Sequence, residues 1–165
     1  MRKAIFPGSF DPPTNGHLDI IRRSLPLFDE VTVAVLNNPN KLPMFTVQER
    51  CEMISELLPH ENKSGCRLSV ESFSGLTAEF ARLRGATAIV RGIRAVSDYE
   101  YELRMALMNR KLEPEIETVF LMAAEEFSYV SSDLMKQVFL LGGNIKGLIP
   151  DLVATKMAAK TMQRS

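Results

Sequence analysis

The chain has 165 residues, 45% of them hydrophobic, which is typical of a globular domain with a buried core, and we expect a single domain over residues 1–165. Its 20 Lys and Arg residues balance 20 Asp and Glu residues, so the zero net charge argues against a nucleic-acid partner. Cys51 and Cys66 lack the spacing of a metal site or a disulfide framework. No apolar run reaches the roughly 18 residues of a membrane span, and no secretory leader is evident. We therefore expect a cytoplasmic protein without a membrane partner.

Apolar segments along the chain alternate between strand-like and helix-like patterns. Short apolar runs rich in β-branched residues predict strands at about residues 3–7, 31–36, 67–72, 86–90 and 118–122. Amphipathic or capped segments predict helices at about residues 16–28, 46–58, 77–84, 97–112, 132–142 and 150–162. Two of these helices begin with Ser/Thr-x-x-Glu sequences, at Thr46 and at Ser97, that predict capping boxes.

This alternation predicts an α/β fold. We expect a Rossmann-like, doubly wound sheet of five parallel strands, with helices on both faces and an extra C-terminal helix. In such sheets the ligand lies at the carboxyl ends of the strands, where the strand order reverses. A flavodoxin-like order with that switch point between the first and fourth strands would place His17 beside Arg91 and Arg94.

The stretch 3–17, KAIFPGSFDPPTNGH, has the pattern of a strand, a tight polar turn and the start of a helix. The free backbone N–H groups and the positive dipole end of a helix start favour bound phosphate. His17, in the first turn of that helix, adds a directional hydrogen-bond donor. The same dipole disfavours an imidazolium, so we expect His17 to be neutral or paired with a ligand.

Several common catalytic patterns are absent from the sequence. There is no G-x-G-x-x-G after the first strand, no P-loop, no G-x-S-x-G elbow and no Cys/His cluster for zinc. What remains is a set of donors that suit phosphate, namely Ser9, His17, Lys41, Arg91, Arg94, Ser131 and Ser132. Phosphoryl and nucleotidyl transfer depend on positioning and charge stabilisation more than on a protein nucleophile, so this set suits that chemistry.

Three blocks of sequence resemble one enzyme family. Residues 8–17, GSFDPPTNGH, are similar to the first motif of the T/H-x-G-H nucleotidyltransferase superfamily. RGIR at 91–94 with DYEYE at 98–102, and FSYVSS at 127–132 with Lys136, resemble the bacterial phosphopantetheine adenylyltransferases. The resemblance covers nearly the whole chain. It implies transfer of the adenylyl group of ATP to 4′-phosphopantetheine, giving dephospho-CoA and pyrophosphate, in the penultimate step of coenzyme A biosynthesis.

The same resemblance implies roles for individual residues. His17 would stabilise the transition state, with Lys41 and Arg91 as further catalytic residues. Phosphopantetheine would be bound by Ser9, which orients its phosphate, and by Lys41, Thr77 and Arg91. ATP would be bound by Ser9, Phe10, His17, Gly92, Ile93, Arg94, Glu102, Phe127, Ser128, Tyr129, Val130, Ser131, Ser132 and Asp133. Three positions depart from the family pattern: Ser9 replaces a common Thr, Phe127 a common indole, and Thr77 a residue that can be apolar.

The resemblance further implies Mg²⁺ as a cofactor, held mainly by ATP phosphates and water rather than by protein ligands. It also implies a homohexamer and feedback binding of coenzyme A. Nicotinamide-mononucleotide adenylyltransferases and glycerol-phosphate cytidylyltransferases would share the first motif. A catalytically silent nucleotide-binding or coenzyme A-binding protein would share the fold, but the intact set of His17, Lys41 and Arg91 favours an enzyme.

Overall fold

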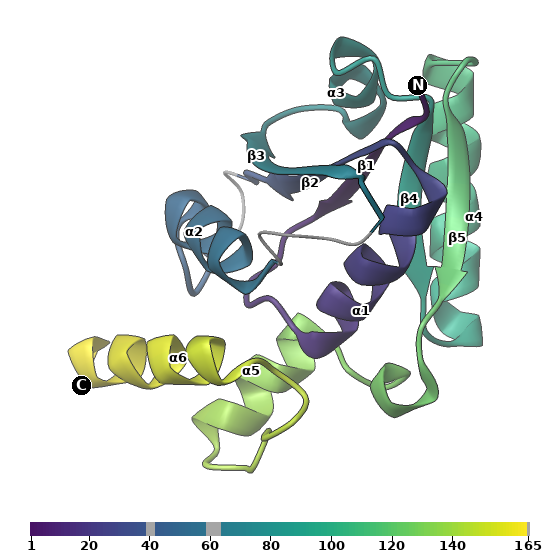
Figure 1. Cartoon of the computed structure of the whole chain (residues 1–165). Coiled ribbons are helices and arrows are strands. Elements are labelled where there is room, and N and C mark those ends of the chain that lie inside the picture. Colours follow the sequence, from purple (N-terminus) through teal and green to yellow (C-terminus); the bar gives the residue numbers. More distant parts are fainter. Residues whose placement is uncertain (39–41, 59–63, 165) are drawn as a thin grey trace.

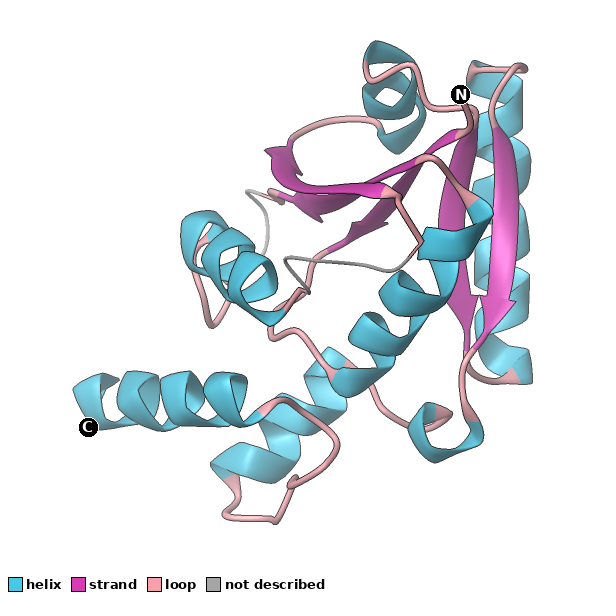
Figure 2. Ribbon diagram, viewed as in Figure 1, coloured by secondary structure: helices cyan, strands magenta, loops and turns pink. Residues whose placement is uncertain are grey.

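The computed structural model describes residues 1–38, 42–58 and 64–164. Within them, parallel strands form one sheet in the order β3-β2-β1-β4-β5 (Figures 1 and 2). This order confirms the Rossmann-like sheet that we expected, and it differs from the flavodoxin-like order that we considered for the switch point. The predicted switch point between β1 and β4 is nevertheless confirmed.

The elements agree with the sequence prediction in number and kind over the described residues. The strands are β1 (Lys3–Gly8), β2 (Glu30–Leu36), β3 (Arg67–Phe73), β4 (Ala88–Ile93) and β5 (Glu117–Met122). The helices are α1 (Asn15–Ser24), α2 (Val47–Leu57), α3 (Thr77–Leu83), α4 (Val96–Leu112), α5 (Ser132–Leu140) and α6 (Asp151–Arg164). None of the described helices is long and apolar enough to cross a membrane.

Alternate residues of β1 face opposite layers of helices, as expected for a sheet covered on both faces. Ala4 and Phe6 belong to a core cluster that includes Leu18 and Ile21 of α1 and residues of α2. Ile5, between them in sequence, belongs to the opposite cluster with residues of α3 and β4. Burial on both faces explains why the central strands are almost entirely apolar.

The ladder between β1 and β4 is short, and this creates room for a site. The two strands pair only through Ala4 with Ala88 and Ile5 with Ile89. Both strands continue beyond these pairs toward their carboxyl ends. Their backbones therefore separate at the switch point, where ligands bind in sheets of this kind.

Three predicted boundaries are wrong for identifiable reasons. The helix predicted at 16–28 ends at Ser24 and continues as a 3₁₀ turn that contains Pro26, which lacks a backbone N–H. The strand predicted at 86–90 extends to Ile93, so Arg91 lies within β4 and not after it. The helix predicted to begin with a cap at Ser97 instead begins at Val96, with Ala95 as its N-cap.

The capping box predicted at Thr46 is confirmed. The Thr46 hydroxyl accepts from the backbone N–H of Glu49 at 3.2 Å, and the Glu49 carboxylate accepts from the backbone N–H of Thr46 at 2.7 Å. These paired bonds begin α2 immediately beside the carboxyl end of the sheet, and therefore fix the helix that follows the loop after β2.

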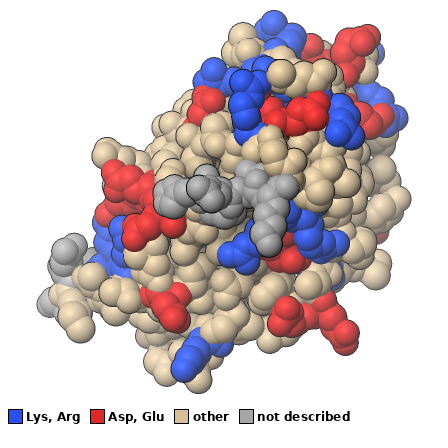
Figure 3. All heavy atoms as spheres, in the orientation of Figure 1, with Lys and Arg blue, Asp and Glu red and all other residues tan. Residues whose placement is uncertain are grey.

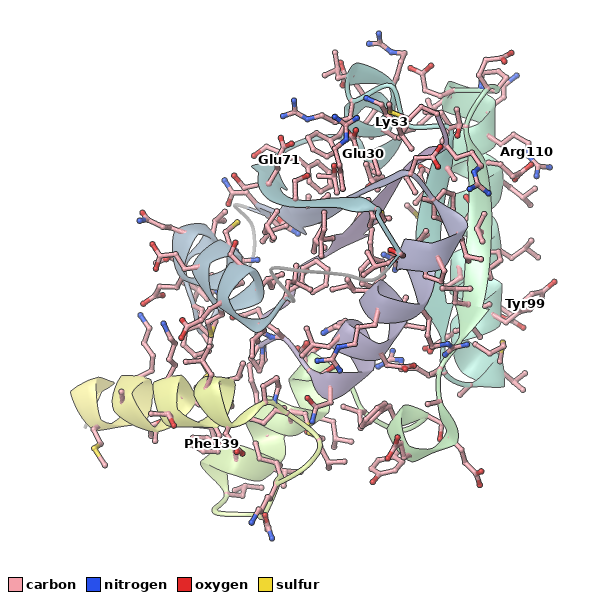
Figure 4. All side chains as sticks on the ribbon, in the orientation of Figure 1. Lys3, Glu30, Glu71, Tyr99, Arg110 and Phe139 are labelled. Atoms are coloured by element: carbon pink, nitrogen blue, oxygen red, sulfur yellow. The ribbon has the colours of Figure 1, made fainter. Side chains whose placement is uncertain are left out.

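Two parts of the surface around the sheet differ in character. Lys3 and Arg67 pair with Glu30 near the amino ends of the strands, and Arg84 pairs with Glu71 of the edge strand β3 (Figure 4). Acidic and basic side chains are mixed on this part of the surface (Figure 3). In another part of the molecule, α5 and α6 enclose a separate apolar cluster that is extended by Phe139 (Figure 4).

Candidate active site

A cavity of about 330 Å³ opens where β1 and β4 separate. It is lined from several elements: the ends of β1, β2 and β4, the first turns of α1, α4 and α5, and the loop after β5. The predicted ligand-binding residues that line it are Ser9, Phe10, His17, Arg91, Gly92, Arg94, Glu102, Phe127, Val130, Ser131, Ser132 and Asp133. One cavity therefore gathers residues that are up to 124 positions apart in sequence, from Ser9 to Asp133.

The orientation of His17 is set by the residue that caps its own helix. Thr14 is the N-cap of α1, and its backbone N–H donates to Nδ1 of His17 at 3.0 Å. In return, the Thr14 hydroxyl accepts from the backbone N–H of His17 at 3.3 Å. With Nδ1 acting as an acceptor, a neutral His17 carries its proton on Nε2. The half-buried ring lines the cavity, to which it offers an N–H donor.

The surroundings of His17 keep it neutral. Burial, and then the positive charges of Arg94 and Arg91, lower its pKa from 6.5 to about 4. The positive end of the α1 dipole acts in the same direction. The Phe10 ring meets the imidazole edge to face, with centroids 4.9 Å apart. His17 is therefore an uncharged, directional donor at neutral pH.

Arg91 is held in place by a buried carboxylate and a backbone carbonyl. Its Nε and Nη2 donate to the two oxygens of Glu102 at 2.8 and 2.6 Å. Its Nη1 donates to the Pro7 carbonyl at 2.7 Å, where β1 no longer pairs with β4. A guanidinium has five N–H groups, so after these three bonds two of them remain to meet an anion in the cavity.

Arg94 is also fixed by several partners. Its Nε and Nη2 donate to Asp98 at 2.9 and 3.2 Å, and its Nη1 donates to the Val130 carbonyl at 2.9 Å. Although burial raises it, the pKa of Asp98 is lowered overall, because Arg94 bonds to that carboxylate and places a positive charge beside it. This network connects the end of β4 to the loop before α5, and so positions the two sides of the cavity relative to each other.

The start of α5 faces the cavity, and both of its serine hydroxyls already have hydrogen-bond partners. Ser131 is the N-cap, and its hydroxyl oxygen accepts from the backbone N–H of Leu134 at 3.1 Å. The Ser132 hydroxyl donates to the Pro12 carbonyl at 2.7 Å, which ties α5 to the loop after β1. The first N–H groups of α5 and its dipole are suited to phosphate.

Two glycines allow aromatic rings to approach closely. A Cβ on Gly8 would lie 3.0 Å from the Phe10 ring, whose residue adopts a left-handed backbone with φ of 50°. A Cβ on Gly16 would lie 3.3 Å from the Cβ of Phe127. Small residues at these positions let Phe10 support His17 and let Phe127 approach the start of α1.

Some predicted site residues lie elsewhere. Lys41 lies outside the described residues. Thr77 begins α3 after the edge strand β3, and the described cavity lining does not include it. The lining also lacks Ile93, Ser128 and Tyr129, of which Ile93 is buried and Tyr129 is 60% exposed. Their roles toward ligands remain predictions.

Sequence reasoning missed four charged residues that line the cavity: Asp11, Arg50, Asp98 and Lys136. Lys136 was noted only as part of a motif, although its Nζ lies 3.3 Å from Asp11 and 3.2 Å from Asp133. Arg50 is 3% exposed on α2. A charged residue between the apolar positions of a helix is expected to face solvent. Only the position of the neighbouring loop in the folded protein shows that Arg50 is buried.

Comparisons with known proteins agree with this geometry. A family model described as cytidylyltransferase-like matches residues 5–138. The phosphopantetheine adenylyltransferase of Alkaliphilus metalliredigens (strain QYMF) is 50% identical over 162 residues, which is 98% of this chain and 100% of that protein. That of Anaeromyxobacter dehalogenans (strain 2CP-C) is 51% identical over 159 residues, covering 96% of this chain and 94% of the other. The chain therefore belongs to the phosphopantetheine adenylyltransferase family.

Proposed function

We propose that this protein transfers the adenylyl group of ATP to 4′-phosphopantetheine, giving dephospho-CoA and pyrophosphate. The observation that carries the proposal is the convergence of the Nε2 donor of His17, the fixed guanidiniums of Arg91 and Arg94 and the start of α5 on one cavity. The identity of about half the residues to phosphopantetheine adenylyltransferases selects this reaction among those that such a site can catalyse.

In this reaction a phosphate oxygen of phosphopantetheine attacks the α-phosphorus of ATP. The new P–O bond forms as the bond to the bridging oxygen breaks, and that oxygen leaves with pyrophosphate. The attacking phosphate is largely ionised at neutral pH because its second pKa is about 6, so the protein need not supply a base. His17 would donate from Nε2 to the oxygens of the α-phosphate as negative charge develops on them.

The two substrates would occupy different sides of the switch point. Arg94, Phe127 and the start of α5 lie on the β4–β5 side and are proposed to hold ATP. Ser9 follows β1 and shares a bond to Arg50 with Leu36 at the end of β2. It is proposed to orient the acceptor phosphate, together with Arg91 of β4, which bonds to the Pro7 carbonyl of β1. The remaining N–H groups of Arg91 suit a phosphate, which guanidinium binds well.

Mg²⁺ is proposed to enter with ATP. Three carboxylates that line the cavity already face cations: Asp11 faces Lys136, Asp98 faces Arg94, and Glu102 faces Arg91. The described residues contain no group of three or more His, Cys, Asp and Glu side chains that could hold a metal ion. Triphosphate oxygens and water, which Mg²⁺ prefers, would supply most of its ligands, and the ion would neutralise phosphate charge.

We also propose that the chain forms an oligomer, a homohexamer on the family resemblance, with coenzyme A as a feedback ligand. The helix α4 exposes large apolar side chains, including Tyr99 at 49%, Leu107 at 54% and Met108 at 54%. Tyr99 points away from the sheet (Figure 4). Several large apolar side chains exposed along one helix support an interface. Light scattering should give a hexamer mass, and a monomer mass would refute this proposal.

The experiment that tests the reaction mixes the protein with ATP, Mg²⁺ and 4′-phosphopantetheine and follows pyrophosphate release. We expect release that requires all three components. Tight binding of coenzyme A without any pyrophosphate release would instead favour a catalytically silent binding protein.

A further inference from the structure

We propose that Arg50 is a positioning residue for the acceptor side of the site, where it sets the affinity for phosphopantetheine. This inference rests on the proposed function. Arg50 lies in the first turns of α2, is 3% exposed and lines the cavity. A buried guanidinium is costly unless its N–H groups are satisfied, so its partners indicate what it does.

The partners of Arg50 are backbone carbonyls from three different segments. Nη1 donates to Ser9 at the end of β1, at 2.6 Å, and to Leu36 at the end of β2, at 3.1 Å. Nε lies 3.2 Å from the Phe45 carbonyl and 3.3 Å from that of Thr46, and donates to both. One side chain therefore joins the carboxyl ends of two strands to the segment that begins α2.

A second buried charge makes the reciprocal bonds. Asp11, 6% exposed in the loop after β1, accepts from the backbone N–H groups of Met44 and Phe45, each at 2.9 Å. Arg50 thus binds carbonyls of both segments, and Asp11 joins the same two segments through N–H groups. Ordinary strand pairing cannot make these connections, because both segments lie beyond the ends of the strands.

The arrangement acts on the acceptor side and not on the nucleotide side. Ser9, whose carbonyl Arg50 holds, carries the hydroxyl proposed to orient the attacking phosphate. Leu42 and Pro43, which precede the Met44 and Phe45 bound by Asp11, line the cavity, as Leu36 does. Apart from Ser9, Phe10 and His17, the proposed ATP contacts lie on β4, α4, α5 and the loop before α5, to which the described bonds of Arg50 do not extend. A change at Arg50 should therefore move the acceptor contacts and leave most of the ATP contacts in place.

The test compares Arg50→Lys and Arg50→Gln with the wild type, measuring kcat and KM for each substrate with the other saturating. Lysine keeps the charge, but its single ammonium cannot reproduce the planar fork that binds carbonyls on two sides. We expect Arg50→Lys to raise KM for phosphopantetheine about tenfold and to change KM for ATP less than about twofold, since small displacements weaken a positioned contact strongly. We expect Arg50→Gln likewise to raise KM for phosphopantetheine much more than KM for ATP.

Ile54→Val provides the matched control, because Ile54 is a fully buried core residue of the same helix. This variant should lower the melting temperature, but it should not change KM for phosphopantetheine relative to KM for ATP. Equal changes in both KM values, or an unchanged KM for phosphopantetheine in Arg50→Lys, would overturn the assignment of Arg50. Absence of turnover in the wild-type protein would overturn the proposed function itself, and with it the role of Arg50 in acceptor binding.

Discussion

The backbone N–H of Thr14 donates to Nδ1 of His17, and the bond is 3.0 Å long. This contact assigns the imidazole proton to Nε2, on the side of the ring that can meet substrate. The donor is the backbone N–H of Thr14, the residue that caps α1. The bonds that begin the helix therefore also set the orientation of the His17 ring. The T-x-x-H spacing of residues 14–17 therefore has a geometric reason.

Replacement of His17 by alanine should slow the chemical step. We expect kcat to fall by at least about 10²-fold, the usual loss when a donor to a developing negative charge is removed. KM values should change much less, because the donor acts mainly in the transition state. Steady-state kinetics with a circular-dichroism check of the fold would measure this effect. An unchanged kcat would remove His17 from the mechanism.

His17 should also make the stability of the protein depend on pH. Its pKa is about 4 in the folded state and 6.5 in the reference state, so between these values the unfolded chain binds a proton that the folded chain does not. The free energy of unfolding should therefore fall as pH falls through this window, by about 2 kcal/mol between pH 6.5 and 5. Denaturant titrations of the wild type and His17→Gln measure the difference. Parallel pH profiles for the two proteins would contradict the lowered pKa.

Replacement of Arg91 by alanine should have two separable effects. It should raise KM for phosphopantetheine more than KM for ATP, because a proposed phosphate contact is lost. It should also destabilise the fold by about 3 kcal/mol, since Glu102 would remain buried without its partner.

The double variant Arg91→Met with Glu102→Leu separates these effects. Replacing both charges with apolar side chains should recover much of the stability but none of the phosphopantetheine affinity. Thermal unfolding and steady-state kinetics on the same samples would show this. A KM rise confined to ATP would place Arg91 on the nucleotide side instead.

Replacement of Gly16 by alanine should weaken ATP binding without destabilising the fold. The added methyl group would lie 3.3 Å from the Cβ of Phe127 and would push the loop before α5 outward by a few tenths of an ångström. Alanine is a better helix former than glycine by about 1 kcal/mol, so the melting temperature should stay level or rise. KM for ATP is the readout, and no change in it would show that the close approach of Phe127 is not needed.

The fold could be predicted almost completely from sequence because its signals are local. Apolar runs marked the strands, and the Thr46 capping box marked the start of α2. The errors in strand bounds came from tertiary structure. The strand β4 extends through Arg91 because its pairing with β5 continues to Ile93, and the residue types at Arg91-Gly92 do not indicate this pairing.

The site could be predicted in part. The sequence indicated His17 because it lies in the first turn of a predicted helix, and Arg91 because it follows an apolar run, although β4 in fact continues past it. It did not indicate Arg50, whose partners are main-chain carbonyls from segments far apart in sequence. Every residue has a backbone carbonyl, so a side chain that binds carbonyls does not require particular residue types at the positions of its partners. The sequence therefore carries no signal of such a contact.

The most direct test of the central claim is an end-point assay that quantifies both products from ATP, Mg²⁺ and 4′-phosphopantetheine. We expect dephospho-CoA and pyrophosphate in equal amounts, with no turnover when nicotinamide mononucleotide replaces phosphopantetheine and none when CTP and glycerol phosphate replace both substrates. Pyrophosphate release with either replacement at a rate equal to that with phosphopantetheine, or no dephospho-CoA at all, would contradict it.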